Sequence, residues 1–276
     1  MAKFFRRIFD IIKKWFSHDV PNEDTNVGEE VIETPVEDTE IEEPQEEDDD
    51  TVAATPTDTN ILDDEKEPFI KILVDNGHGY DTPGKKSPYS CYKVLPELPF
   101  EEWKWAREIS HALVKELTEL GYDADLLVPE ENDVPLKERV RRVNEICNKL
   151  GKNNVILISI HANAAGNGKE WLKARGWSAF TTKGVTKSDE LANHLYTAAL
   201  RTFNGKKIRT DYSDGDPDWE ENFYIIKNTY CPAVLTENFF YDNIDDVTYI
   251  SSDKGKEDIL KVHVRGITSY LNDLKK

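Results

Sequence analysis

The chain has 276 residues and a formal net charge of −19, but this charge is confined to one part of it. Residues 17–68 carry 21 acidic residues against one lysine, whereas residues 69–276 carry 32 acidic against 29 basic residues, a net charge of −3. A balanced segment of that length is typical of one domain with a sizeable core. It has no basic stripe, and the acidic segment would repel phosphates, so we expect no nucleic-acid partner.

Residues 1–17 predict an amphipathic basic helix. At about 100° per residue, the apolar side chains of residues 1–16 share one face and the charged ones share the other. Five basic residues and one acidic residue give these positions a net charge of +4. This pattern favours binding to an anionic membrane surface, with docking onto a protein partner as the alternative. Charges interrupt the apolar run and no small-residue cleavage site follows, so we expect synthesis in the cytoplasm without a standard signal peptide.

Residues 18–68 are interpreted as a disordered acidic linker, because they hold too few apolar residues to offset the entropy of ordering. No stretch of the chain has the length and apolar character of a membrane span. The three cysteines, Cys91, Cys147 and Cys231, are odd in number and widely spaced. This spacing argues against both a disulfide framework and a CxxC zinc module.

Residues 69–276 alternate between strand and helix patterns. The predicted strands lie at residues 71–75, 122–128, 155–160, 177–182, 224–227 and 233–237. The predicted helices lie at residues 100–120, 135–150, 186–203 and 256–274. Gly121 is placed to end the first helix, and Thr186 with Asp189 forms a possible capping box. The alternation indicates an α/β fold: a twisted, mainly parallel sheet with helices on both faces, in three layers.

Two histidines directly follow apolar runs of strand type. His78 comes after residues 71–77, and His161 comes after residues 155–160. The carboxyl ends of parallel strands meet at one edge of a sheet, so we expect both imidazoles at one site. Imidazole and carboxylate ligands suit zinc. Glu101 and Glu102, at the start of the first helix, could each supply a carboxylate ligand. Glu237 follows the buried run 232–236, where a carboxylate needs polar partners, and a zinc-bound water would supply one.

Three blocks of the sequence, Ile72–Gly79, Ser159–Ala164 and Ala233–Phe240, resemble the motifs of the zinc-dependent N-acetylmuramoyl-L-alanine amidases of the Amidase_3 type, in the same order. The resemblance extends from about Lys71 to Leu271, and three ordered blocks are far more specific than a lone Gly-His-Gly.

The resemblance implies that His78 and His161 bind Zn²⁺, that Glu237 is the catalytic acid/base, and that the third ligand is the glutamate which opens the first helix. Counting back from Gly121 selects Glu102 for that position. Asn163 would contact the substrate or hold its own loop.

A zinc amidase catalytic domain at 69–276 would cleave the amide bond between N-acetylmuramic acid and L-alanine in peptidoglycan, and we expect it to act on the cell wall as a monomer. The chain departs from the family pattern at Asn76, where proline is usual, at Phe239, where glycine is usual, and in the loop 81–84. Two alternatives remain open: a different zinc amidohydrolase or peptidase, and a membrane-anchored, non-catalytic wall-binding module.

Overall fold

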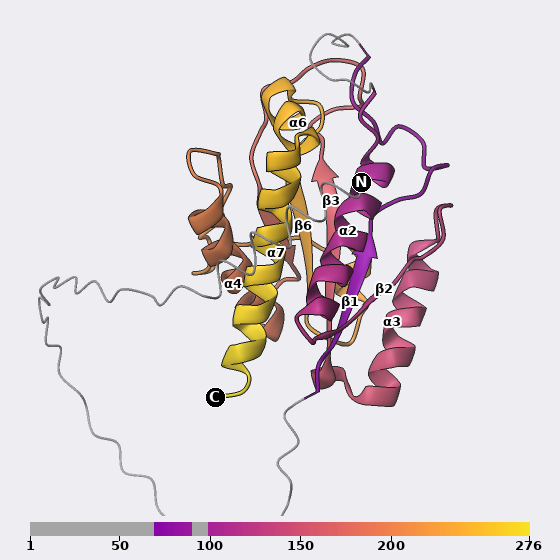
Figure 1. Cartoon of the computed structure of the whole chain (residues 1–276), viewed down its shortest axis with the longest axis vertical. Coiled ribbons are helices and arrows are strands. Elements are labelled where there is room, and N and C mark those ends of the chain that lie inside the picture. The colour runs from indigo at the N-terminus through magenta and orange to yellow at the C-terminus, as the bar shows by residue number, and fades with distance from the viewer. Residues whose placement is uncertain (1–68, 90–98) are drawn as a thin grey trace, which may run out of the picture. The chain divides into compact units, whose positions relative to one another are not determined.

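A computed structural model describes residues 69–89 and 99–276 (Figure 1). Two predicted segments lie outside these residues and stay predictions: the amphipathic helix at 1–17 and the linker at 18–68. Cys91 also lies outside them. The other two cysteines, Cys147 and Cys231, are buried free thiols. Among the helices that the structure describes, none combines the length and apolar character needed to cross a bilayer.

The described strands form one six-stranded sheet in the order β2-β1-β3-β6-β4-β5. The strands are β1 (Lys71–Asn76), β2 (Asp123–Leu126), β3 (Val155–Asn163), β4 (Ser178–Thr181), β5 (Trp219–Glu220) and β6 (Ala233–Phe240). Parallel pairing joins β1 to β2 and β3, and β3 to β6. β4 is antiparallel to β6 and carries β5 in parallel at the edge. The predicted mainly parallel sheet is confirmed, with two reversed strands on one side.

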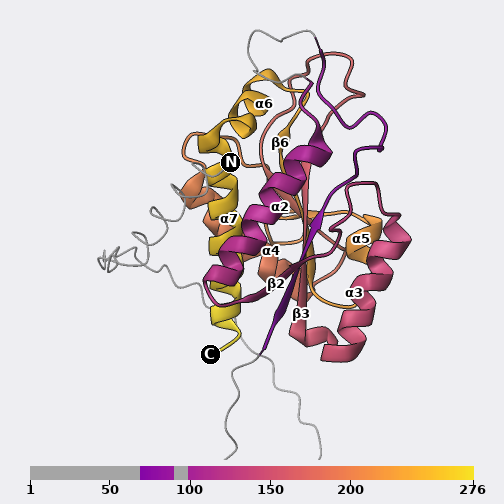
Figure 2. The same cartoon turned by 45° about the vertical axis from the view of Figure 1, so that its right-hand side comes forward.

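Helices cover both faces of this sheet, which confirms the predicted three layers (Figure 2). α2, α4 and α7 pack together on one face, and α3 and α5 pack together on the other. The helices are α2 (Glu102–Glu119), α3 (Leu136–Leu150), α4 (Lys187–Thr202), α5 (Tyr224–Lys227), α6 (Ile244–Ser251) and α7 (Asp253–Asp273), and a short 3-10 turn spans Lys152–Asn154.

The central strand β3 explains why its sequence is continuously apolar. Its side chains alternate between the two faces, and each face is buried beneath helices. Leu157 belongs to the apolar cluster that also contains Val143 of α3 and Ile225 of α5. Ile156 and Ile158, one residue out of phase, are at most 1% exposed as well. This double burial holds the ends of β3 and its neighbours rigidly in place.

Two local signals for helix ends are confirmed. Gly121 adopts a left-handed backbone with φ of 90° just after α2, and its N–H donates to the Thr118 carbonyl at 3.0 Å. Thr186 and Asp189 form the predicted capping box at the start of α4. Glycine is favoured at position 121 because it has no Cβ to clash in the left-handed conformation.

The strand predicted at 224–227 is wrong, because these residues form the short helix α5. A short apolar run such as Tyr224–Lys227 fits a buried strand and a buried helical turn equally well. The turn is closed by the Lys227 N–H, which donates to the Phe223 carbonyl at 2.9 Å. β5 and α6 were not predicted. For α6 a signal exists, because the Asn243 side chain caps the N–H groups of Asp245 and Asp246.

Candidate metal centre

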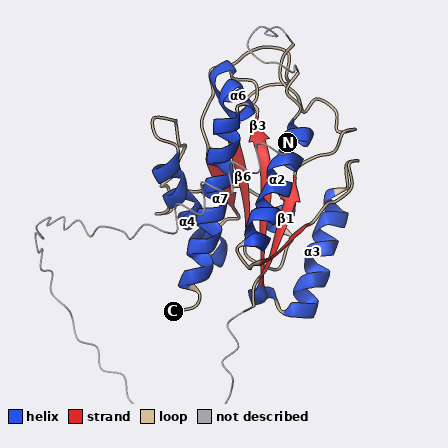
Figure 3. Cartoon of the chain, viewed as in Figure 1, coloured by secondary structure: helices blue, strands red, loops and turns tan. Residues whose placement is uncertain are grey.

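Three neighbouring parallel strands bring the candidate site together at one edge of the sheet. β1, β3 and β6 lie side by side (Figure 3). His161 lies near the end of β3 and pairs in register with Glu237 of β6. His78 lies two residues beyond the last residue of β1. The two imidazole rings meet edge to face, with their centroids 4.9 Å apart.

Glu102, the first residue of α2, lies between the two histidines. Its Oε1 is 3.0 Å from His161 Nδ1, and its Oε2 is 3.3 Å from His78 Nε2. The Oε1 atom also accepts the backbone N–H of Ala162 at 3.1 Å. One ligand atom from each of the three residues falls within 4.8 Å of the others. The neighbouring Glu101 is not a member of this cluster, and its backbone instead forms a β-bridge with Lys86.

The donor set of this cluster fits a zinc ion. Two imidazole nitrogens and one carboxylate, arranged around a common point, are the ligands of many catalytic zinc sites. Glu102 is only 1% exposed, and its buried Oε2 has no polar neighbour besides the 3.3 Å contact with His78 Nε2. Burial raises the pKa of Glu102, but the hydrogen bonds with His161 and His78 outweigh that effect and bring the pKa to about 2. The carboxylate is therefore charged, as a metal ligand must be.

Glu237 supplies a second carboxyl group beside the first. Its Oε2 is buried and has no hydrogen-bond partner. Burial is the main cause that raises the pKa of Glu237 to about 8; the positive charge of His161 opposes it, and the charge of Glu102 adds to it. A carboxyl group with a pKa near neutrality can both take up and release a proton.

Asn163 ends β3 on the same edge. Its side-chain oxygen accepts the backbone N–H of Ala164 at 2.8 Å, and its carbonyl accepts the N–H of Tyr241 at 2.8 Å. The side chain thus contacts its own loop, and a contact between Asn163 and the substrate stays a prediction.

Comparisons with known proteins identify the family of this chain. Residues 72–269 match the family profile described as N-acetylmuramoyl-L-alanine amidase (Amidase_3). The chain belongs to this amidase family. It is 25% identical over 165 residues to the endolysin of Bacillus phage SPP1, which is 59% of this chain but only 56% of the endolysin. It is also 26% identical over 211 residues to the sporulation-specific N-acetylmuramoyl-L-alanine amidase of Bacillus subtilis, covering 75% of this chain and 70% of that protein.

A solved structure shares the fold of this amidase-family chain. The N-acetylmuramoyl-L-alanine amidase from Clostridium difficile 630 superposes with a TM-score of 0.59 at 24% identity, over 74% of this chain and 98% of that one.

The Gly-His-Gly motif of this amidase-family member has a steric explanation. A Cβ at Gly77 would lie 2.3 Å from the His161 ring, and a Cβ at Gly79 would lie 2.0 Å from the backbone of Asp133. His78 between them has a φ of 62°, a left-handed conformation that costs a non-glycine residue about 1–2 kcal/mol. The backbone before His78 therefore packs against the His161 ring, and the backbone after His78 packs against the loop at Asp133.

Two arginines, which the sequence analysis missed, hold His78 in that conformation. Arg107 Nη1 donates to the His78 carbonyl at 2.9 Å, and Arg139 Nη2 donates to it at 3.3 Å. Arg139 is 2% exposed and forms a 2.7 Å ion pair with Asp75, which is 1% exposed. A signal was present, since an acidic residue inside an apolar strand and an arginine on the apolar face of a helix each need a buried partner.

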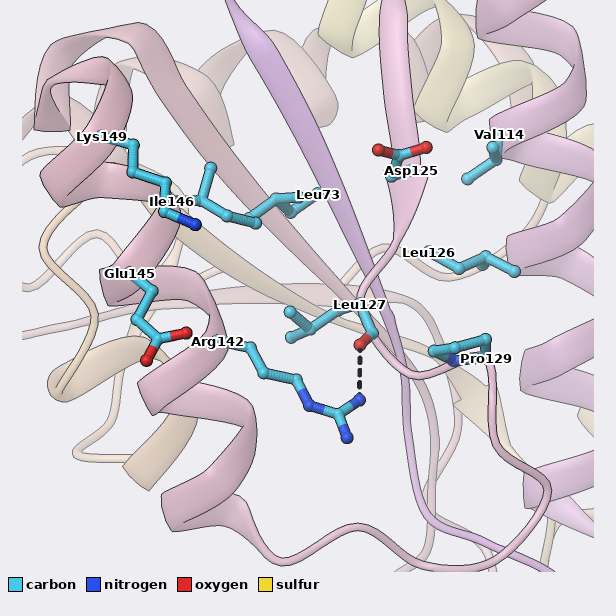
Figure 4. Close-up of a pocket in the computed structure, with 10 residues that line it drawn as sticks. All are labelled: Leu73, Val114, Asp125, Leu126, Leu127, Pro129, Arg142, Glu145, Ile146 and Lys149. Carbon is cyan, nitrogen blue, oxygen red and sulfur yellow. Dashed lines mark hydrogen bonds between the residues drawn. The ribbon is translucent and has the colours of Figure 1, made fainter.

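The chain also has a hollow away from the cluster, of about 560 Å³ (Figure 4). It lies beside the edge strand β2 and the helix α3, and its lining includes Leu127, Pro129 and Arg142. Arg142 Nη1 donates to the Leu127 carbonyl at 3.1 Å across it. None of the residues His78, Glu102, His161 or Glu237 lines this hollow, so it is not part of the candidate site.

Proposed function

We propose that this chain is a zinc-dependent peptidoglycan amidase that cleaves the bond between N-acetylmuramic acid and L-alanine. The observation that carries the proposal is the Glu102 carboxylate held between His78 and His161, with the buried, unpartnered Oε2 of Glu237 on the paired strand. The family match and the names of the relatives support the choice of bond, and the geometry supports the class of reaction.

His78, Glu102 and His161 would hold the zinc ion. When bound, zinc would supply Lewis acidity to a water molecule and to the scissile carbonyl. Arg107 and Arg139 would keep His78 in place through its carbonyl oxygen. The fixed arrangement costs no reorganisation when the substrate arrives, which is the advantage of a preorganised site.

Glu237 would move the proton. Its carboxylate form would accept the proton of the attacking water, and its protonated form would return that proton to the leaving nitrogen of L-alanine. The paired register with His161 keeps this carboxyl group at the same edge as the three proposed ligands. Because burial raises the pKa of Glu237 to about 8, both forms are accessible near neutral pH in the metal-free protein.

Two aromatic residues beside the cluster would contact the substrate. Tyr80 follows His78 by two residues and is 62% exposed, and it meets Trp103 edge to face at 6.3 Å. Trp103 directly follows Glu102 and is also covered by the Arg107 guanidinium at 5.7 Å. An exposed tyrosine and a half-buried tryptophan next to buried polar groups have the composition expected for a ligand-binding surface.

The test of the reaction uses purified sacculi. Incubation with the zinc-loaded chain should release stem peptides with a new amino group on L-alanine, and a chelator should stop the release until zinc is restored. New amino groups on other residues would instead make the protein a peptidase. Binding to sacculi without any release would make it a non-catalytic wall-binding module.

The test of the metal site compares two adjacent residues. Glu102→Gln should lower the zinc content of the purified protein along with activity, because it removes the charge between the histidines. Glu101→Gln should leave both unchanged. A loss of zinc from the Glu101 variant alone would show that the proposed ligand is wrong by one residue.

We infer further that residues 1–16 bring the enzyme to anionic membrane surfaces while residues 18–68 keep it clear of them. The segregated apolar face and the net charge of +4 support membrane binding, and the acidic residues support a spacer that the same lipids repel. The protein would then act on the cell wall from a membrane-associated position.

A further inference from the structure

A second cluster of carboxylates lies in a different part of the sheet. Asp216 and Asp218 precede β5, and Asp189 lies in the first turn of α4. One oxygen from each of the three falls within 4.8 Å of the others. Asp218 is 1% exposed and Asp189 is 6% exposed, so two of the three charges are withdrawn from water.

The polar groups around this cluster leave some of its carboxylate oxygens without a hydrogen bond. Thr181 Oγ1 donates to Asp218 Oδ2 at 2.6 Å, and Asp189 accepts the N–H of Thr186 through its capping box. The other oxygen of Asp218 and the Oδ1 of Asp216 are buried and have no hydrogen-bond partner. In the described part of the chain, no lysine or arginine forms an ion pair with any of the three carboxylates. An unpaired buried carboxylate oxygen is costly, so the arrangement lacks a positive partner.

The electrostatics of Asp218 point the same way. Burial is the main cause that raises its pKa to about 7, and the adjacent Asp216 carboxyl group adds to the shift. Like charges this close cannot both ionise without a compensating charge. A bound cation is the ordinary means by which proteins keep several buried carboxylates ionised together.

This cluster is separate from the candidate zinc centre. Ser178, the first residue of β4, pairs with Glu237, and β4 runs away from that edge because it is antiparallel to β6. Thr181 lies three residues further on, which is about 10 Å along an extended strand. The two clusters therefore share no ligand.

The ligand chemistry selects the ion. Every candidate ligand is an oxygen, whereas zinc prefers nitrogen and sulfur together with oxygen. Magnesium is usually held by one or two carboxylates and keeps several waters, while calcium takes a larger number of protein oxygens in a flexible arrangement. Three carboxylates converging from a loop and a helix start fit calcium best.

We propose that Asp189, Asp216 and Asp218 bind a calcium ion that fastens the loop before β5 to the start of α4. The ion would supply the positive charge that the unpaired oxygens lack and would join two segments that are distant in sequence. The site would stabilise the reversed edge of the sheet and would take no part in amide hydrolysis.

The test titrates calcium chloride into the metal-stripped, then zinc-loaded, full chain. Isothermal calorimetry should detect a site with a dissociation constant of roughly 0.1–1 mM or tighter, the range of extracellular calcium modules. The melting temperature should rise with calcium and rise much less with magnesium at equal concentration. Equal responses to both ions, or no response up to about 10 mM calcium, would overturn the proposal.

Variants locate the ion. Asp216→Asn, at a position that is only partly buried, should weaken calcium binding by roughly tenfold or more, because it removes a ligand charge. Asp214→Asn changes an exposed acid of the same loop outside the cluster and should leave the titration unchanged. An unaltered calcium response in Asp216→Asn would refute the site. Zinc content and activity on sacculi should be the same in both variants, so a failure here is distinguishable from a failure of the amidase proposal.

Discussion

Replacing Arg139 by methionine should destabilise the protein by about 3–5 kcal/mol, the typical result of breaking a buried ion pair by removing one partner. Arg139 is 2% exposed. It donates hydrogen bonds to Asp75 at 2.7 Å, to the Asn76 carbonyl at 2.9 Å, to Asp133 at 3.0 Å and to the His78 carbonyl at 3.3 Å. One side chain of α3 thus ties together the end of β1 and the loop that carries His78.

The magnitude depends mainly on the charge left behind. Without Arg139, Asp75 keeps only the hydrogen bond from Ser159 Oγ, at 2.6 Å, while its carboxylate stays 1% exposed. Each lost hydrogen bond to a neutral acceptor adds only about 1 kcal/mol. The expected loss is a large part of the 5–15 kcal/mol that typically stabilises a native protein, so the variant should fold but unfold at much lower denaturant concentration.

Urea unfolding of the metal-free protein measures the effect, and α3 provides the matched control. Arg141 lies two residues further on the same helix, is 54% exposed, and pairs with Glu138 and Glu145 at the surface. Arg141→Met should therefore cost no more than about 1 kcal/mol. The double variant Asp75→Asn/Arg139→Met should be more stable than Arg139→Met, because the orphaned charge is gone. Equal costs for Arg139→Met and Arg141→Met, or no relief in the double variant, would refute the reasoning.

Three other predictions can be checked directly. Glu237→Gln keeps the shape of the side chain, so the protein should retain zinc while stem-peptide release falls by roughly 10²–10⁴-fold; near-normal release would exclude the proton-transfer role. Burial lowers the pKa of His263 from 6.5 to about 4, so the unfolded chain takes up a proton at this residue before the folded chain does. The free energy of unfolding should therefore fall by up to about 3 kcal/mol as the pH drops from 6.5 to 4, and urea titrations of His263→Gln should not show this loss. The double variant Phe5→Asp/Ile12→Asp should abolish sedimentation with anionic liposomes, whereas raised salt should only weaken it. Removal of residues 1–66 should leave activity on purified sacculi intact. Failure of the intact chain to sediment would contradict the membrane anchor.

The edge of the sheet that carries the candidate site could be predicted from the sequence because it depends on local patterns. An apolar run predicts a strand, and in a parallel sheet the residues that follow neighbouring strands must meet. The strand pattern alone therefore places His78, His161 and Glu237 at one edge of the sheet. Glu102 required the family resemblance, since adjacent helix residues differ by only about 100° in direction.

Features that depend on tertiary packing could not be predicted in this way. The direction of β4 is not encoded in its four residues, because a short buried strand has the same apolar pattern whether it is parallel or antiparallel. The pairing of Asp75 with Arg139 joins residues 64 positions apart. The acidic cluster likewise joins Asp189 to Asp216 and Asp218 across an intervening helix. For the ion pair and the acidic cluster, the sequence shows that a buried charge needs a partner but not which residue provides it.

Phe239 shows how packing can override a local backbone preference. Its φ of 68° is a left-handed conformation, which explains why glycine is usual at this position in the motif. A non-glycine residue there costs about 1–2 kcal/mol. Phe239 is 0% exposed and packs edge to face against Phe203 and Tyr249, with ring centroids 5.0 and 5.2 Å away. Truncating a buried phenylalanine typically costs about 3–5 kcal/mol, so the ring stabilises the fold by more than the backbone strain destabilises it. The departure from the motif therefore belongs to the core beneath α6 and need not alter the chemistry two residues away at Glu237.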